Sequence, residues 1–176
     1  LILIGHSMGG KVAMRVAQQY EDLLEKLIVV DMGVKSYPMH HQHILAGIHS
    51  VKVDTIKARR EAEAQMREHI DSEGVLQFLL KNLHWKEKGK LAWRMNTAVL
   101  EREMPEILSA MPEGEVFTPT LFIRGELSNY ILDEDIESIE NQFLDSEIVT
   151  IDGAGHWVHA ESPGEFLEAV LSFCLR

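Results

Sequence analysis

The first ten residues, LILIGHSMGG, constrain the fold of this chain more than any other stretch. Residues 1–4 are apolar strand formers that run without a polar residue into the glycine-flanked Ser7. Residues 11–17 then place apolar side chains where a helix packing on a sheet needs them, with no proline or further glycine. Residues 5–9, GHSMG, fit the G-x-S-x-G pattern of a sharp strand-to-helix turn that lifts a serine hydroxyl above the sheet edge. The alternative is a phosphate-binding loop, but the Lys-Ser/Thr ending and the dinucleotide-turn spacing are both missing.

A second apolar run, residues 27–30, ends in a carboxylate, Asp31. Such a run is typical of a parallel strand that is buried on both faces. In open α/β sheets catalytic groups gather at the carboxyl ends of the strands, so Ser7 and Asp31 are expected on the same rim of the sheet. The alternative is that Asp31 is a loop residue that caps a turn before Gly33.

The middle of the chain changes to a helical pattern. Amphipathic stretches at residues 54–70 and 74–83 are separated by no strand-like run. This block is longer than a crossover between parallel strands requires. We therefore expect an all-α insertion at residues 36–111 that folds over the rim as a cap, between α/β core segments at residues 1–35 and 112–176.

The strand signal returns at residues 119–125 and again at residues 147–151. The second of these strands leads into residues 153–157, GAGHW, a flexible turn that presents His156. The alternative for His156 is a turn histidine bonded only to the backbone. A closing helix is expected at residues 164–175, with these side chains facing inward: Phe166, Leu167, Val170, Leu171 and Cys174.

Composition narrows the classes of partner and compartment. The formal net charge of −11 argues against nucleic acid or an anionic membrane surface as a partner, since both attract a basic protein. A single cysteine, Cys174, excludes an internal disulfide framework and favours a reducing, cytoplasmic location. No window reaches the length of a membrane helix. Because the chain opens with Leu1 inside an apparent core strand, we expect an N-terminally truncated fragment.

Four histidines near the start of the middle block raise the question of a metal site. Their spacing matches no zinc pattern with cysteines or carboxylates at the required intervals, so no metal or other cofactor is expected. The four histidines are His40, His41, His43 and His49. The sequence also carries no signal for an oligomeric state.

Three motifs in this chain resemble those of the α/β-hydrolase family. They are GHSMGG at residues 5–10, a strand ending in RGE at residues 124–126, and GAGHW at residues 153–157, in the family's order of nucleophile before histidine. The resemblance spans the whole sequence and implies the C-terminal part of a mostly parallel sheet with a helical cap. It is closest to small bacterial esterases of the YbfF type, to which four segments are similar: residues 73–81, 93–96, 125–130 and 155–161.

The position of the triad's acid distinguishes this chain from many members of the family. Those members carry an aspartate where this sequence has Ser128, and serine cannot hold a histidine by charge. The YbfF-type resemblance implies that Asp31 is the acid, with Ser128 as a supporting hydrogen-bond partner. Val34 stands where such relatives tend to have proline after the acid. Glu126, the other nearby carboxylate, lies two residues before Ser128 and is expected to point elsewhere.

The residues and the resemblance together predict a serine carboxylesterase for short to medium acyl esters. Ser7 would attack the ester carbonyl, His156 would transfer its proton, and Asp31 would orient the imidazole. The backbone N–H of Met8 is expected to supply half of the oxyanion hole. The other donor would come from a segment that precedes residue 1 in the family.

Candidate substrate contacts come from three residues, His6, Arg94 and Trp157. Arg94 belongs to the stretch 93–96, part of which is expected to line the acyl pocket. The alternative is that the Trp and Met of this stretch are buried core residues, as such residues at this spacing often are. The expected partner is a small-molecule ester. A non-catalytic ligand-binding protein of the same fold is the alternative, as is a thioesterase or peroxidase. An epoxide or haloalkane hydrolase is disfavoured, because it would need an aspartate in place of Ser7.

Overall fold

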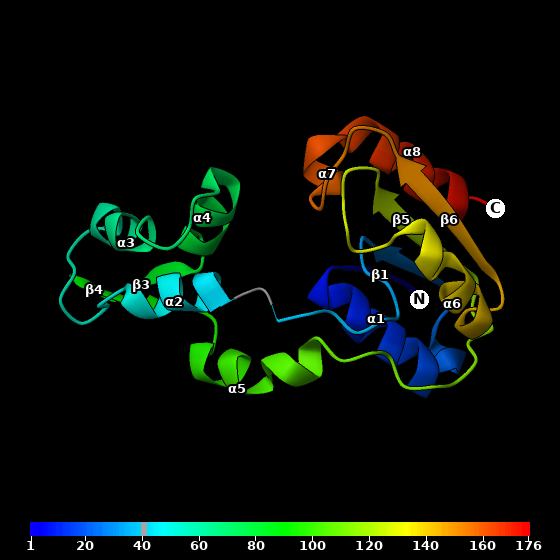
Figure 1. The fold of residues 1–176 in the computed structure, drawn as a ribbon, viewed down its shortest axis with the longest axis horizontal. Helices are drawn as coiled ribbons and strands as arrows, with labels where there is room; N and C mark the ends of the chain where they lie inside the picture. The colour runs from blue at the N-terminus through cyan, green and yellow to red at the C-terminus, as the bar shows by residue number, and fades with distance from the viewer. Residues whose placement is uncertain (40–41) are drawn as a thin grey trace. The chain divides into compact units, whose positions relative to one another are not determined.

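The computed structural model describes residues 1–39 and 42–176, which divide into two compact units (Figure 1). We call Leu1–Tyr37 with Ser109–Arg176 the core unit, and Pro38–Leu108 the insertion unit. The insertion unit is thus shorter at both ends than the expected residues 36–111. The reason is that the core unit holds both flanks: the Tyr37 hydroxyl donates to the Tyr130 carbonyl at 2.8 Å, and the Met111 N–H donates to the Val34 carbonyl at 2.7 Å.

The core unit is built on a parallel four-stranded sheet in the order β1-β2-β5-β6. The strands are β1 (Ile2–His6), β2 (Lys26–Val30), β5 (Thr120–Gly125) and β6 (Ser146–Ile151). All four arise from the apolar runs of the sequence, and β2 is buried from Leu27 to Val30, as a central parallel strand requires. The expected α/β fold class, with a mostly parallel sheet, is confirmed.

Helices connect these strands. Helix α1 (Met8–Gln19) follows β1, and helix α8 (Pro163–Cys174) packs against β5 and β6. The core unit also contains four short helical segments: η1 (Glu21–Leu23), η2 (Asp133–Asp135), α6 (Ile136–Gln142) and α7 (Val158–Glu161).

The inward faces of α1 and α8 differ in part from the expected ones. Helix α1 buries Ala13, Met14 and Ala17, whereas Val12 is 58% exposed. Helix α8 buries Val170 and Phe173, and Phe166 and Cys174 pack partly against the same core. The expectation that Leu167 and Leu171 face inward is wrong, because the buried stripe of the helix is centred on Val170 and Phe173, and both leucines lie outside it and are about half exposed.

The insertion unit is not all-α, contrary to the expectation. It contains α2 (Gln42–Ser50), α3 (Arg59–Met66), α4 (Glu73–Leu80) and α5 (Thr97–Ile107), but also the antiparallel hairpin β3 (Leu83–Glu87) and β4 (Lys90–Trp93). Alternating apolar and polar residues flank Gly89, whose φ of 82° suits a tight turn between two strands. The helix expected at residues 54–70 is shorter in the structure, where only α3 forms in this stretch.

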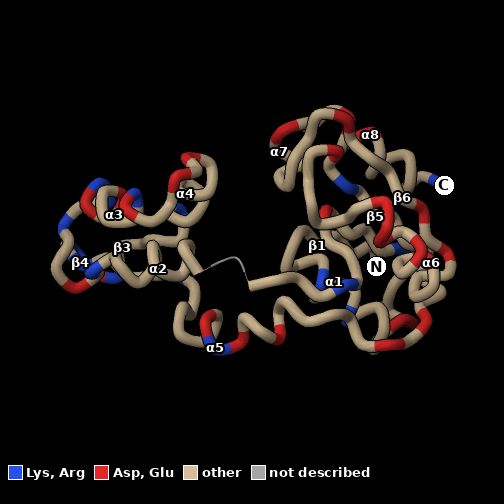
Figure 2. The backbone as a smooth tube through the Cα atoms, viewed as in Figure 1, with Lys and Arg blue, Asp and Glu red and all other residues tan. Residues whose placement is uncertain are grey.

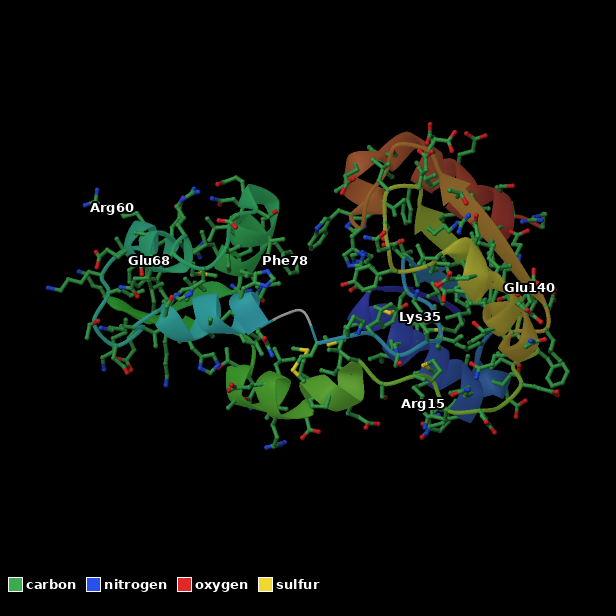
Figure 3. All side chains as sticks on the ribbon, in the orientation of Figure 1. Arg15, Lys35, Arg60, Glu68, Phe78 and Glu140 are labelled. Atoms are coloured by element: carbon green, nitrogen blue, oxygen red, sulfur yellow. The ribbon has the colours of Figure 1, made fainter. Side chains whose placement is uncertain are left out.

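The insertion unit has a core of its own, and Ala62, Met66, Leu76 and Leu83 are completely buried in it. Figure 3 labels Phe78 on α4, which is 47% exposed. Of the four histidines near the start of the middle block, His40 and His41 lie outside the described residues. The Nε2 atom of His49 lies 3.3 Å from a carboxylate oxygen of Glu101, within the same unit.

Charge is spread over both units. Figure 2 shows acidic positions along most elements, with basic positions interspersed among them. This agrees with the excess of 28 Asp and Glu over 17 Lys and Arg in the sequence. Among residues 1–39 and 42–176, no helix combines the length and the apolar character needed to cross a membrane.

Candidate active site

Ser7 occupies the sharp turn between β1 and α1. Its backbone has φ 55° and ψ −123°, a strained conformation for a residue with a side chain, and its N–H donates to the Val30 carbonyl at 3.0 Å. The strand and the helix approach so closely that a Cβ added at Gly5 would lie 2.2 Å from the Gly9 carbonyl oxygen. Only glycine therefore fits at position 5, and the turn holds Ser7 at the carboxyl end of β1.

Asp31 lies at the carboxyl end of the neighbouring strand, β2, and is completely buried. Its φ of 47° is unusual for a non-glycine residue, and its N–H donates to the Ile123 carbonyl at 2.7 Å. The Asp31 side chain does not cap the turn before Gly33, because the Gly33 N–H donates instead to the Tyr37 hydroxyl at 2.7 Å. Asp31 is thus available for contacts across the rim of the sheet.

Three donors surround the carboxylate of Asp31. Oδ1 accepts from the Gly125 N–H at 3.1 Å, while Oδ2 accepts from the Ser128 hydroxyl and lies 2.7 Å from Nδ1 of His156. These bonds satisfy a charge that would otherwise be costly to bury. Glu126, the competing carboxylate, is exposed and accepts from the Gly153 N–H at 2.7 Å.

His156 bridges the carboxylate and the serine. Its Nε2 lies 3.0 Å from the Ser7 hydroxyl oxygen, on the opposite side of the ring from the contact with Asp31. Since an ionised carboxylate only accepts, the bonding pattern assigns the imidazole proton to Nδ1 and leaves Nε2 to accept from the serine hydroxyl. The geometry is that of a serine activated by a base which a buried acid orients.

The turn that carries His156 is bound by side chains from outside it. Glu161, at the end of α7, accepts from the Gly155 N–H at 2.6 Å and from the Trp157 N–H at 3.2 Å. The strand β5 also approaches this turn closely, because a Cβ added at Gly125 would lie 2.2 Å from the Gly155 carbonyl oxygen. Sequence reasoning missed Glu161, although a carboxylate one turn after a helix start is a recognisable signal for bonds to preceding N–H groups.

Aromatic rings enclose the imidazole of His156. The Tyr130 ring stacks on it with the centroids 4.1 Å apart and the planes at 21°, and the His6 ring lies 4.7 Å away. Burial raises the pKa of Tyr130, and the negative charge of Asp31 adds to this shift. Burial lowers the pKa of His6, against the opposing effect of its hydrogen bond with the His156 carbonyl. Tyr130 falls within the segment 125–130 that resembles YbfF-type esterases, but no local pattern in the sequence indicates that its ring stacks on His156.

The three expected substrate contacts have different surroundings. His6 has its Nε2 2.8 Å from the His156 carbonyl oxygen, and its ring centroid is 5.5 Å from that of Trp157, so both lie beside His156. Arg94 belongs to the insertion unit, where its side chain is exposed and its N–H donates to the Asn82 carbonyl at 2.8 Å. The expected role of Arg94 in substrate binding stays a prediction.

The other residues of the stretch 93–96 have structural contacts within the insertion unit. Trp93 and Met95 pack against its core. The Asn96 side chain caps α5 by accepting from the Val99 N–H at 3.2 Å.

Two further observations concern the oxyanion hole and metal binding. Met8 begins α1, so its N–H is one of the first-turn donors that have no acceptor inside the helix, next to Ser7. Within the part of the chain that the structure describes, no cluster of three or more His, Cys, Asp or Glu could hold a metal ion.

The chain matches the Alpha/beta hydrolase family over residues 1–169, and it belongs to this family. Esterase YbfF of Escherichia coli is 38% identical over 168 residues, which cover 95% of this chain and 64% of that protein. The sn-1-specific diacylglycerol lipase ABHD11 of Mus musculus is 37% identical over 179 residues, which cover 98% of this chain and 58% of that protein. The chain therefore spans 58% to 64% of the length of these two relatives.

A solved structure agrees with these relatives. A marine microorganism esterase superposes with a TM-score of 0.93 at 39% identity, covering 98% of this chain and 69% of that chain. The resemblance to the α/β-hydrolase family and to YbfF-type esterases is confirmed.

Proposed function

We propose that the protein is a serine carboxylesterase that hydrolyses short to medium acyl esters through an acyl-enzyme intermediate. The observation that carries this proposal is the continuous chain of contacts from the Ser7 hydroxyl through His156 to the buried Asp31, at 3.0 and 2.7 Å. The esterase and lipase names of the similar proteins support the same class of reaction.

In the first half of the reaction, the Ser7 oxygen attacks the ester carbonyl carbon while Nε2 of His156 takes the hydroxyl proton. Asp31 stabilises the resulting imidazolium, and the N–H of Met8 donates to the developing oxyanion, a contribution of about 3 kcal/mol for each such donor. The tetrahedral intermediate then collapses. The bond to the leaving alcohol breaks, and His156 returns the proton to the alcohol oxygen.

In the second half, water replaces the alcohol. His156 removes one proton from the water, whose oxygen attacks the acyl carbon, and the proton passes to the Ser7 oxygen as the carboxylic acid leaves. Ser128 acts in both halves through Asp31, because its hydroxyl donates to the oxygen that also faces His156. This bond holds the carboxylate oriented toward the imidazole.

The partner in this proposal is a small-molecule ester. The net charge of −11 disfavours nucleic acid and anionic membrane surfaces. The single cysteine supports a cytoplasmic location as part of the same proposal.

The test is a rapid-mixing experiment with p-nitrophenyl acetate and the whole protein. An esterase should release p-nitrophenolate in a burst equal to the enzyme concentration and then turn over steadily. Ser7→Ala should show neither phase, and circular dichroism should show that the variant is folded. Release of at most one slow equivalent without turnover would instead favour a ligand-binding protein. A strong preference for a thioester of the same acyl group would favour a thioesterase.

A further inference from the structure

The backbone around His156 is bound by side chains on both sides of the residue. The N–H groups of Gly155 and Trp157, which flank it, both donate to the carboxylate of Glu161. The carbonyl of His156 itself lies 2.8 Å from Nε2 of His6. Half-buried backbone groups need such partners, and these three groups are paired by side chains and not by a strand or helix ladder.

Glu161 uses both of its oxygens. Oε2 accepts from the Gly155 N–H at 2.6 Å and Oε1 accepts from the Trp157 N–H at 3.2 Å, so the carboxylate spans from the Ala154–Gly155 peptide to the His156–Trp157 peptide. The close contact depends on Gly155, because a Cβ there would lie 3.1 Å from Oε2. A carboxylate that accepts two backbone N–H groups makes stronger bonds than a neutral acceptor and fixes the direction of both peptides.

His6 approaches from the other side. It is the last residue of β1 and directly precedes Ser7 in the chain. Because the His156 carbonyl only accepts, Nε2 of His6 must carry a proton and donate to it. This bond ties the end of the strand that holds the nucleophile to the backbone of the residue that activates it.

From this geometry, and on the basis of the esterase proposal, we propose that Glu161 and His6 are positioning residues that clamp the backbone of His156. Nε2 of His156 must face Ser7 at 3.0 Å while Nδ1 faces Asp31 at 2.7 Å. Both contacts depend on where the peptide of His156 lies, and the adjacent glycines leave that peptide little intrinsic stiffness. A displacement of about 1 Å in such an arrangement costs up to about 100-fold in rate.

The first test measures the kinetics of p-nitrophenyl acetate hydrolysis by the whole protein with Glu161→Ala and Glu161→Gln. Glu161→Ala should lower kcat by about 10- to 100-fold and change KM by less than about twofold, because substrate binding does not involve the carboxylate. Glu161→Gln keeps one acceptor oxygen and should lose less. The matched control is Glu165→Gln, an exposed carboxylate on α8, which should stay within about twofold of wild type.

His6 is tested by His6→Phe, which keeps a ring but removes the donor, and by His6→Asn, which keeps a donor. His6→Phe should lower kcat, and His6→Asn should recover part of the loss. The losses of His6→Phe and Glu161→Ala should not add in the double variant, because both act on the same peptide.

A readout that does not depend on activity separates this clamp from the esterase proposal. The Nδ1 proton of His156, held by Asp31, should give a downfield NMR resonance in wild type, Ser7→Ala and Glu165→Gln. In Glu161→Ala and His6→Phe the resonance should shift or broaden, since a looser imidazole exchanges its proton faster.

The possible outcomes are distinct. An unchanged resonance and kcat in both variants, even with a lowered Tm, would overturn the clamp. If Glu161→Ala does not fold, Glu161→Gln and His6→Phe decide by the same criteria. An absence of ester turnover in wild type would defeat the esterase proposal alone, and the resonance would still decide the clamp.

Discussion

The turns that carry Ser7 and His156 are held by different kinds of interaction. The serine turn is fixed by the backbone, because Gly5 and Gly9 approach within a distance that excludes a side chain at position 5. The histidine turn is fixed by side chains from three elements, namely His6 at the end of β1, Glu126 after β5 and Glu161 on α7. A turn fixed by local sterics can be recognised from a few consecutive residues, whereas one fixed by distant side chains cannot.

The largest expected effect concerns the acid that orients the ring of His156. Asp31→Asn should lower kcat by about 10⁴-fold, because the amide no longer selects the imidazole tautomer that accepts from Ser7. Glu126→Gln should stay near wild type in kcat, because the amide oxygen can still accept from the Gly153 N–H and the side chain does not bond to the ring. Steady-state kinetics with p-nitrophenyl butyrate measure both. The reverse pattern would transfer the role of the acid to Glu126.

The next prediction tests the serine turn itself. Gly5→Ala should destabilise the fold by several kcal/mol, about 3 or more, because the new Cβ would lie 2.2 Å from a carbonyl oxygen that cannot easily move. Gly9→Ala is the control, since no atom lies within 4 Å of the corresponding Cβ. Urea unfolding monitored by fluorescence compares the two variants. Equal stability of the two would mean that sterics do not hold the serine turn.

A smaller effect is expected from the ring that covers His156. Tyr130 stacks at 4.1 Å on an imidazole that would become positively charged in the proposed reaction, and an aromatic face favours a cation by about 0.5–1 kcal/mol. Tyr130→Leu should therefore lower kcat for p-nitrophenyl butyrate by about two- to fivefold. Tyr130→Phe keeps the stacked face and should leave kcat near the wild-type value. A loss of equal size in both variants would assign the effect to the hydroxyl.

The main elements of the core unit could be predicted from the sequence because each has a strong local pattern. Unbroken apolar runs indicate the strands, and the helical spacing after Ser7 indicates α1. The hairpin β3–β4 was missed because its strands are short and mixed in polarity, and Trp85 is about half exposed. The outward direction of Leu167 and Leu171 depends on how α8 packs, which no local pattern specifies.

The candidate site divides in the same way. Ser7, Asp31 and His156 each end or follow a strand, so topology brings them to one rim, and the motifs identify their types. Tyr130 and Glu161 act through contacts with His156 that depend on the tertiary placement of their loops. The expected contact of Arg94 with a substrate stays a prediction.

The remaining prediction concerns a buried side chain in the helix that follows Ser7. Lys11, in the first turn of α1, is only 7% exposed, and its ammonium group donates to the carbonyls of Lys35, at 3.0 Å, and of Ser109. These carbonyls belong to the two segments that flank the insertion unit in the sequence. Burial lowers the pKa of Lys11 to about 8 in the folded protein. The helix behind Ser7 therefore contains a titratable group whose charged form is disfavoured by folding.

The direction of the pH effect follows from comparing the folded and unfolded states. Unfolding returns Lys11 to a pKa of about 10.4, so between about pH 8 and 10 the unfolded chain binds more protons than the folded one. The contribution of Lys11 to the free energy of unfolding should therefore rise with pH across that window and stay constant below it. The deprotonated amine still has two N–H groups, one for each carbonyl, so the rise occurs without loss of either bond.

Lys11→Met isolates this contribution, because every other titrating group is common to both proteins. Urea unfolding at pH 7, 8, 9 and 10 should show the free energy of wild type minus that of Lys11→Met rising by about 1 to 2 kcal/mol. Lys35→Met is the control: the Lys35 side chain, labelled in Figure 3, pairs with the carboxylate of Asp135. Its difference from wild type should show no such rise between pH 8 and 9. A flat difference for Lys11→Met would mean that the ammonium is hydrated in the folded state.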